Sequence, residues 1–202
     1  MKKNKFGLII LGIFCTLSGY AQEEFFGNKN GLTLSGSFNL DNSVQTEIKT
    51  GGLSLYLKNG IIFSGSYSKM YNTVYSQVSL NYLFNNSKHT EGMKSILGLS
   101  FGSIYDRYNI NKNNFVGVNM GLIKVFFYKS NFPFSIGGSA SFASYLYNMH
   151  YKSSNLGLTI GYTQSFFAKG WVYPVLGVSK SFIIGQDSSD WFVHAGLNIR
   201  LS

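Results

Sequence analysis

Apolar and polar residues alternate one by one along most of this chain. The clearest example is the C-terminal stretch WFVHAGLNIRLS at 191–202, in which every second residue is apolar from Trp191 to Leu201. The opposite positions hold His194, Asn198 and Arg200, together with a glycine. Because successive side chains of a β-strand point to opposite faces, this alternation predicts a strand with one apolar and one polar face.

Similar segments recur along the chain, and no helical periodicity competes with them after residue 22. They lie near residues 32–40, 53–58, 61–68, 74–84, 97–102, 116–122, 134–142, 155–162, 171–182 and 191–201. Asn59-Gly60, between the second and third segments, is typical of a tight hairpin turn. The facing of the ninth segment is ambiguous, because Pro174 marks either a bulge or the start of a strand. The pattern predicts an all-β fold of ten antiparallel strands, or eight if the first two segments or the ninth are not strands.

The polar faces of these segments are small and neutral. They consist mostly of Ser, Gly, Asn and Thr, and charged residues make up only 12% of the chain, against about 25% in average soluble proteins. A secreted β-sandwich or a soluble ligand-binding barrel would also alternate, but its outward face meets water and carries charges. We therefore predict an antiparallel up-and-down transmembrane β-barrel with its apolar face in lipid and its polar face around a narrow lumen.

Aromatic residues cluster near the predicted strand ends, as interfacial girdles require. They are Tyr67, Tyr82, Phe84, Tyr105, Phe126, Phe127, Tyr128, Tyr145, Tyr162, Phe166, Phe167, Trp171 and Trp191. With the N-terminus taken as periplasmic, we expect outer loops near 41–50, 68–73, 106–114, 146–154 and 183–190. The inner turns are then expected near 58–60, 85–94, 128–133 and 165–170.

The first 21 residues have the features of a secretory signal peptide. A lysine-rich start precedes an apolar stretch at 6–17, and Gly19 and Ala21 precede a cleavage point before Gln22. An uncleaved anchor is the alternative, but the stretch is shorter than the ~20 residues that a membrane helix needs. Residues 22–202 then form one domain. The lone Cys15 lies in the leader, so the mature chain has no disulfide.

The charge balance of the mature chain is mildly basic. Removing the leader takes away three of the 17 basic residues, which leaves 14 basic and 8 acidic residues and a net charge of +6. The charges are scattered and form no basic stripe, which argues against nucleic-acid binding. Such a surface is compatible with anionic lipid or glycan.

The whole chain resembles the small outer-membrane β-barrel proteins of Gram-negative bacteria. The resemblance is carried by the leader ending in SGYAQ, the alternating segments and the terminal AGLNIRLS, and the Ala-Gln junction is similar to that of Bacteroidota members. It implies Sec export, residence in the outer membrane, contact with outer-membrane lipid and lipopolysaccharide, and the barrel-assembly machinery as a partner. The chain ends on Ser202, where the family often ends on an aromatic residue.

No pattern in the chain predicts a cofactor or a metal. His89, His150 and His194 lie in separate segments without metal-ligand spacing. NMHYKSSNLGL at 148–158 is loosely similar to the His-x-Ser-Asn signature of outer-membrane lipid A deacylases, but Lys152 stands where the serine belongs. We therefore expect no enzyme, and a lipid A hydrolase is a lesser alternative.

Two expected outer loops combine aromatic with basic residues and are candidates for external contacts. The candidate loop residues are Tyr105, Asp106, Arg107, Tyr108, Lys112, Tyr147, His150 and Lys152, and the candidate lumen residues are His194, Asn198 and Arg200, with His194 near Arg200. The expected function is envelope structure, adhesion or binding. The alternatives are a narrow pore for small solutes and a soluble barrel that holds a ligand. The sequence leaves the oligomeric state open.

Overall fold

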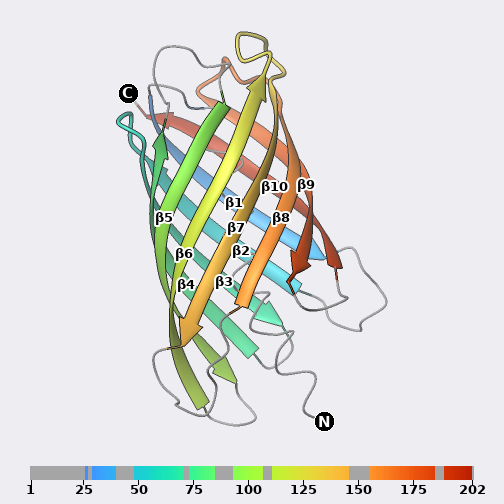
Figure 1. Cartoon of the computed structure of the whole chain (residues 1–202). Helices are drawn as coiled ribbons and strands as arrows, with labels where there is room; N and C mark the ends of the chain where they lie inside the picture. The colour runs from blue at the N-terminus through green and yellow to red at the C-terminus, as the bar shows by residue number, and fades with distance from the viewer. Residues whose placement is uncertain are drawn as a thin grey trace.

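The protein is a closed barrel of ten β-strands in the part of the chain that the structure describes (Figure 1). This computed structural model describes residue 26 and residues 29–39, 48–70, 73–84, 93–106, 111–145, 155–184 and 189–201. The strands are β1 (Asn30–Asn39), β2 (Ile48–Tyr56), β3 (Ile61–Met70), β4 (Thr73–Phe84), β5 (Met93–Asp106), β6 (Asn111–Phe126), β7 (Phe134–Tyr145), β8 (Asn155–Ser165), β9 (Val172–Ile183) and β10 (Ser189–Leu201).

Each strand pairs antiparallel with its neighbour in the chain, and β1 pairs with β10 to close the sheet. The prediction of an all-β, up-and-down barrel of ten strands is confirmed. Within the described residues, no helix is long and apolar enough to cross a membrane. The expected leader, residues 1–21, lies outside the described residues.

The two ends of the barrel are named by their connections. At one end, which we call the turn end, the described turns 57–60, 127–133 and 166–171 join β2 to β3, β6 to β7 and β8 to β9, and 85–92, outside the described residues, joins β4 to β5. The chain also finishes there, at the top of Figure 1. The opposite end, which we call the loop end, receives the connections that follow β1, β3, β5, β7 and β9.

The strands reach further toward the loop end than we expected from sequence. Tyr105 and Asp106 belong to β5, and Lys112, which pairs with Tyr105, belongs to β6. The expected loop 106–114 is therefore wrong, because the connection between the two strands spans only 107–110. The reason is that the in–out alternation continues there: Ile104 is buried and Tyr105 is exposed. Continued alternation allows the strand pairing to run on.

The hairpin predicted at Asn59-Gly60 is confirmed, and it needs its glycine. Gly60 has φ of 93°, a conformation that L side chains rarely adopt. Its N–H donates to the Leu57 carbonyl and its own carbonyl accepts from Leu83 N–H, both at 2.8 Å. A Cβ at Gly60 would lie 2.6 Å from the Leu83 carbonyl oxygen. The turn is thus fastened to the end of β4.

The ambiguity at Pro174 is resolved in favour of a regular strand. Pro174 is the third residue of β9 and pairs with Leu197 in an unbroken register with β10. Its neighbours Tyr173 and Val175 are fully buried, so Pro174 faces outward. Its carbonyl accepts from Phe166 N–H at 3.0 Å. The backbone edge of Pro174 that would carry an N–H therefore faces the turn 166–171 and not a paired strand. The missing N–H of proline is therefore tolerated there.

Candidate functional site in the barrel interior

A belt of hydroxyl and amide side chains lines the middle of the barrel. Several pairs join residues that face each other directly in the strand register: Thr33 Oγ1 donates to Asn198 Oδ1 at 2.8 Å, and Thr159 and Ser181 share a bond of 3.1 Å. Ser54 donates to Ser64 at 3.1 Å in the same way. Each such cross-strand pair contributes about 0.2–1 kcal/mol. The neutral lumen face predicted from sequence is therefore also a set of links between neighbouring strands.

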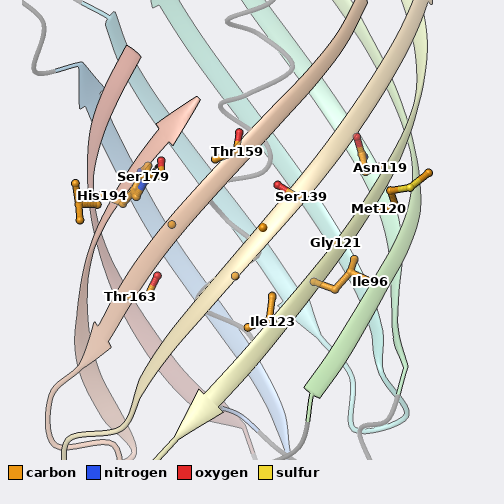
Figure 2. A pocket seen from close by; sticks show the side chains of 14 residues that line it. Ile96, Asn119, Met120, Gly121, Ile123, Ser139, Thr159, Thr163, Ser179 and His194 are labelled. Carbon is orange, nitrogen blue, oxygen red and sulfur yellow. Dashed lines mark hydrogen bonds between the residues drawn. The ribbon is translucent and has the colours of Figure 1, made fainter. Parts of the chain in front are cut away.

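His194 is the titratable residue of this belt. It points inward from β10 toward Ser179 of β9, as Figure 2 shows, and the Ser179 Oγ and His194 Nε2 atoms lie 2.7 Å apart. Gly177 is the residue directly opposite His194 in the strand register. A Cβ there would lie 2.9 Å from the Tyr162 carbonyl oxygen and 3.5 Å from His194 Cδ2. Glycine at this position therefore leaves room for the imidazole ring.

A serine hydrogen-bonded to a histidine is also the first half of a hydrolytic site, so its surroundings matter. A nucleophile of this kind needs its base held in orientation by a third group. His194 Nδ1 has no hydrogen-bond partner among the described residues. The cavity beside the pair, lined by Ser139, Thr159 and others, measures about 40 Å³, enough for a few water molecules and no lipid substrate. The pair is best understood as a hydrogen bond that joins β9 to β10.

An apolar cluster fills the lumen at the turn end. Phe26 is its centre: its ring stacks on Tyr56 with 5.6 Å between centroids and meets the Tyr173 ring edge-on at 6.2 Å. A Cβ at Gly31 would collide with the Phe26 ring. The members, which we call the turn-end cluster, are Phe26, Tyr56, Ile62, Leu83, Ile96, Ile123, Val125, Ala168, Tyr173 and Val175. The sequence pattern does not predict this cluster, although the alternation places Tyr56 on the inward face.

The loop half of the interior holds less apolar packing. A shallow groove of about 660 Å³ crosses β2 to β5 in this half, mostly on the outer face, between the exposed side chains of Leu53, Tyr67, Val78 and Phe101. Both amide atoms of Gln77 are buried without a hydrogen-bond partner in the described part of the chain. A smaller apolar cluster of Tyr75, Ile104, Phe115 and Ala143 covers one side of this half. The apolar packing of the described lumen is thus more extensive at the turn end than at the loop end.

The candidate lumen residues do not form one group. Asn198 is fully buried and bonded to Thr33, and His194 is buried in the belt. Arg200 lies six residues beyond His194, about 20 Å along the strand, so the expectation that the two are neighbours is wrong. Arg200 belongs to the turn end, where its guanidinium lies 5.2 Å from the centre of the Tyr173 ring.

The candidate loop contacts are only partly described. Tyr105 projects outward from β5 and is 39% exposed, and Asp106 and Lys112 are placed by their backbones. The remaining candidates, Arg107, Tyr108, Tyr147, His150 and Lys152, lie outside the described residues. No binding role of these residues is therefore tested by the fold.

An aromatic band surrounds the barrel at the turn end. Phe126 stacks on Phe134 at 4.8 Å, and Phe132 contacts Phe167 at 5.5 Å. Phe127 and Phe167 have φ of 51° and 56°, and their side chains are 65% and 62% exposed. These positive φ values are costly for residues with a Cβ, so the turns hold these two rings outward against a local strain.

Tyr128 is an exception to the girdle that we predicted. Instead of facing outward it packs, partly buried, against the turn-end cluster. Burial raises the pKa of its hydroxyl above the usual value, and the positive charge of Arg200 opposes that rise in part. The reason for the difference is the turn geometry: the residue before it, Phe127, takes the outward position. Alternation along strands does not predict which way a turn residue points.

No group of three or more metal-binding side chains occurs among the described residues.

No protein-family model matches the chain, and no curated protein matches it. Several solved structures, in contrast, match the chain. The N-terminal β-barrel domain of Pseudomonas aeruginosa OprF is 10% identical with a TM-score of 0.37, over 86% of this chain and 98% of that one.

Two further solved structures match with somewhat higher TM-scores. The NanC porin is 12% identical with a TM-score of 0.46, over 84% of this chain and all 100% of its own. The β domain of the Bordetella autotransporter BrkA is 12% identical with a TM-score of 0.47, over 85% of this chain and 98% of that one. At these low scores, the fold assignment rests on the strand pairing of the chain itself.

Proposed function

We propose that the protein is an integral outer-membrane β-barrel without enzymatic activity, which serves envelope structure, adhesion or binding through its loop end. One observation carries the proposal: the barrel is apolar outside and polar at its waist inside. Every strand presents a large hydrophobic side chain that is 38–60% exposed. These are Leu34, Leu53, Phe63, Leu80, Leu99, Met120, Ile136, Leu158, Leu176 and Leu197.

A continuous apolar belt of this kind is unsuited to water. Soluble monomers rarely expose apolar patches above a few hundred Å², and here the patch runs around all ten strands. In lipid the same belt needs no cover, and the closed sheet leaves no strand edge without a hydrogen-bond partner. The aromatic band at the turn end lies where a membrane interface places such residues. This supports a membrane location in preference to a soluble, ligand-binding barrel.

A narrow pore is the second candidate. The polar belt favours it, since water and small solutes could lie against its hydroxyl and amide groups. The turn-end cluster opposes it, because Phe26, Tyr56 and Tyr173 fill the lumen there. Solutes would pass only if Phe26 left its position. We therefore place the pore below the binding and structural role.

The partners that we propose follow from this location. They are outer-membrane lipid and lipopolysaccharide around the belt, and the barrel-assembly machinery during biogenesis after Sec export. No cofactor is proposed, and a lipid A hydrolase stays the least supported alternative because the Ser179–His194 pair is enclosed.

The test is electrophoresis of the outer-membrane fraction with and without boiling. We expect the protein in that fraction, as a fast-migrating band that slows after boiling, because a closed barrel in detergent stays compact until heated. Protein found only in the periplasm or the medium, with no shift on boiling, would contradict the proposal. Single-channel recording in a planar bilayer then separates the pore from the closed barrel.

A further inference from the structure

Four cationic side chains converge on one pocket at the turn end. The pocket has a volume of about 390 Å³ and is bordered by Lys29, Lys58, Lys169 and Arg200. These residues come from the segment before β1, the two turns 57–60 and 166–171, and the end of β10. The neighbouring strands β9, β10, β1 and β2 therefore contribute together, at the seam where the barrel closes.

None of the described residues that border the pocket is acidic; besides the four cations they are Asn30, Gly170, Trp171 and Leu201. Lys58 has a further interaction within the chain, so the charges left to attract an anion are those of Lys29, Lys169 and Arg200. Like charges held close together repel one another, and the repulsion is relieved when an anion lies between them. The arrangement therefore favours a ligand with at least one negative charge.

Arg200 is positioned to donate to such an anion. Its guanidinium stacks over the Tyr173 ring, with 5.2 Å from Cζ to the ring centre. One of its terminal nitrogens makes a long bond of 3.4 Å to the Gly170 carbonyl. Its Nε is buried and has no hydrogen-bond partner within the described residues. The planar donor fork of a guanidinium suits the oxygens of a phosphate group.

The rim of the pocket is apolar on its outer side. Trp171 is 73% exposed, the highest value among the large hydrophobic residues that the structure describes, and Leu201 is 39% exposed. Tryptophan prefers the level of lipid headgroups, with its ring between the polar and apolar layers. Clusters of basic residues at a membrane surface attract anionic lipid headgroups. A free phosphate ion would gain nothing from this apolar rim.

We propose that this pocket binds the phosphate of an anionic phospholipid in the leaflet at the turn end, held by Lys29, Lys169 and Arg200 beside Trp171. The inference rests on the proposed membrane location. It goes beyond that location by assigning a defined lipid site at the closure seam. The same site would fasten the first and last strands of the barrel to the bilayer surface.

The chain carries its own reporter for this site. Trp171 borders the pocket, and Trp191, the other tryptophan of the chain, lies at the opposite end of β10. A Trp191→Phe variant therefore leaves one fluorophore at the pocket. We would reconstitute it in phosphatidylcholine vesicles and replace a fraction of the lipid by phosphatidylglycerol with brominated chains. Brominated phosphatidylcholine at the same fraction is the reference.

We expect brominated phosphatidylglycerol to quench Trp171 more strongly than brominated phosphatidylcholine. The relative affinity should fall by about fivefold for each lysine removed in Lys29→Gln and Lys169→Gln. The matched control is Lys69→Gln with Lys180→Gln, which removes two lysines from the other half of the barrel and should leave the preference at Trp171 unchanged. Equal quenching by the two brominated lipids would overturn the lipid site.

Two further measurements distinguish a lipid site from a free-anion site and from a pocket occupied by the chain itself. Inorganic phosphate that abolishes the preference would show a free-anion site and overturn the lipid assignment; we expect no competition. A large gain in the preference on replacing Glu23 and Glu24 by Gln would mean that carboxylates of the chain occupy the pocket, and would also overturn it. Absence of quenching by either brominated lipid would mean that Trp171 does not meet a bilayer, so the proposed function itself would fail.

Discussion

The two ends of the barrel are built on different principles. At the turn end, the described turns carry lysines, an aromatic band faces outward and an apolar cluster fills the lumen. At the loop end the described interior holds a cluster of only four apolar residues. By sequence position, five of the eight acidic residues fall in or beside the connections at the loop end: Asp41, Glu47, Asp106, Asp187 and Asp190.

The difference shows that the two ends of one closed sheet can serve different purposes. The turn end combines the features that stabilise a barrel and hold it at one depth: a packed interior, interfacial rings and a basic rim. The loop end has a smaller apolar cluster and charges of both signs, as befits a surface that meets varied partners. We therefore expect substitutions at the turn end to affect stability more than comparable ones at the loop end.

The largest effect should come from Phe26→Ala. Removal of a buried phenylalanine costs about 3–5 kcal/mol of unfolding free energy, and Phe26 contacts two further rings of the turn-end cluster. Phe115→Ala, in the smaller cluster of the loop half, is the control and should cost less. Urea titration of the folded protein in detergent, followed by tryptophan fluorescence, measures both. Equal losses would remove the contrast between the ends.

The Phe26→Ala variant also tests whether Phe26 closes the lumen to solutes. If Phe26 closes the lumen, its removal should raise single-channel conductance well above that of the native chain in a planar bilayer. Phe115→Ala should leave the current at its native value. An unchanged, silent Phe26→Ala barrel that is still folded by the heat-shift criterion would show that the rest of the turn-end cluster suffices to close the lumen.

A middle-sized effect is expected at the waist, between the two ends. Gly177→Ala places a methyl group against the Tyr162 carbonyl and the His194 ring, and such overpacking costs about 1–3 kcal/mol. Gly51→Ala is the matched control, because a Cβ there meets nothing within 4 Å. The urea midpoints of the two variants should differ clearly. A Gly177→Ala protein as stable as the native one would mean that His194 moves aside without cost.

A smaller effect is expected for single hydrogen bonds. Thr33→Val removes the donor to Asn198 Oδ1 from the buried belt, for a loss of about 1 kcal/mol. Ser76→Ala breaks an exposed bond of 2.9 Å to Ser103 on the outer face and should change stability little. The denaturation curves of the two variants test whether the belt contributes more than outward polar pairs do.

The smallest effect concerns pH. Burial raises the pKa of Tyr128 above its usual value of 10.0, so the folded chain holds this proton more tightly than the unfolded chain. The resulting stability is complete below pH ~10 and is lost as the pH rises through the folded pKa. Tyr128→Phe should lose stability less steeply above pH ~10 than the native protein. Parallel slopes for the two proteins would show that Tyr128 is not buried.

Much of the fold could be predicted from sequence, because a strand with two unlike faces leaves a period of two in the residues. The hairpin at Gly60 and the closing strand that ends at Leu201 are both found where that pattern places them. The strand ends are less well predicted, as Tyr105 and Lys112 show, since polar residues at a barrel rim are compatible with either strand or loop.

The interior could be predicted only in part. Alternation identifies which residues point inward, but not which of them meet across the lumen. Phe26 precedes the first alternating segment, so no period marks it, and its place depends on Gly31 and on the rings of Tyr56 and Tyr173. Likewise, the cations of the turn-end pocket are scattered in sequence from Lys29 to Arg200 and become neighbours only because β1 pairs with β10.

The central claim is that the apolar face points outward into lipid, and two adjacent residues test it most directly. The expected mature chain has no cysteine, so Leu99→Cys and Ser100→Cys can each carry a single spin label. In vesicles we predict that the label at 99 is relaxed mainly by oxygen, which dissolves in lipid, and that the label at 100 is shielded from it inside the barrel. The reverse, with position 99 open to a water-soluble nickel complex and position 100 in lipid, would contradict the account.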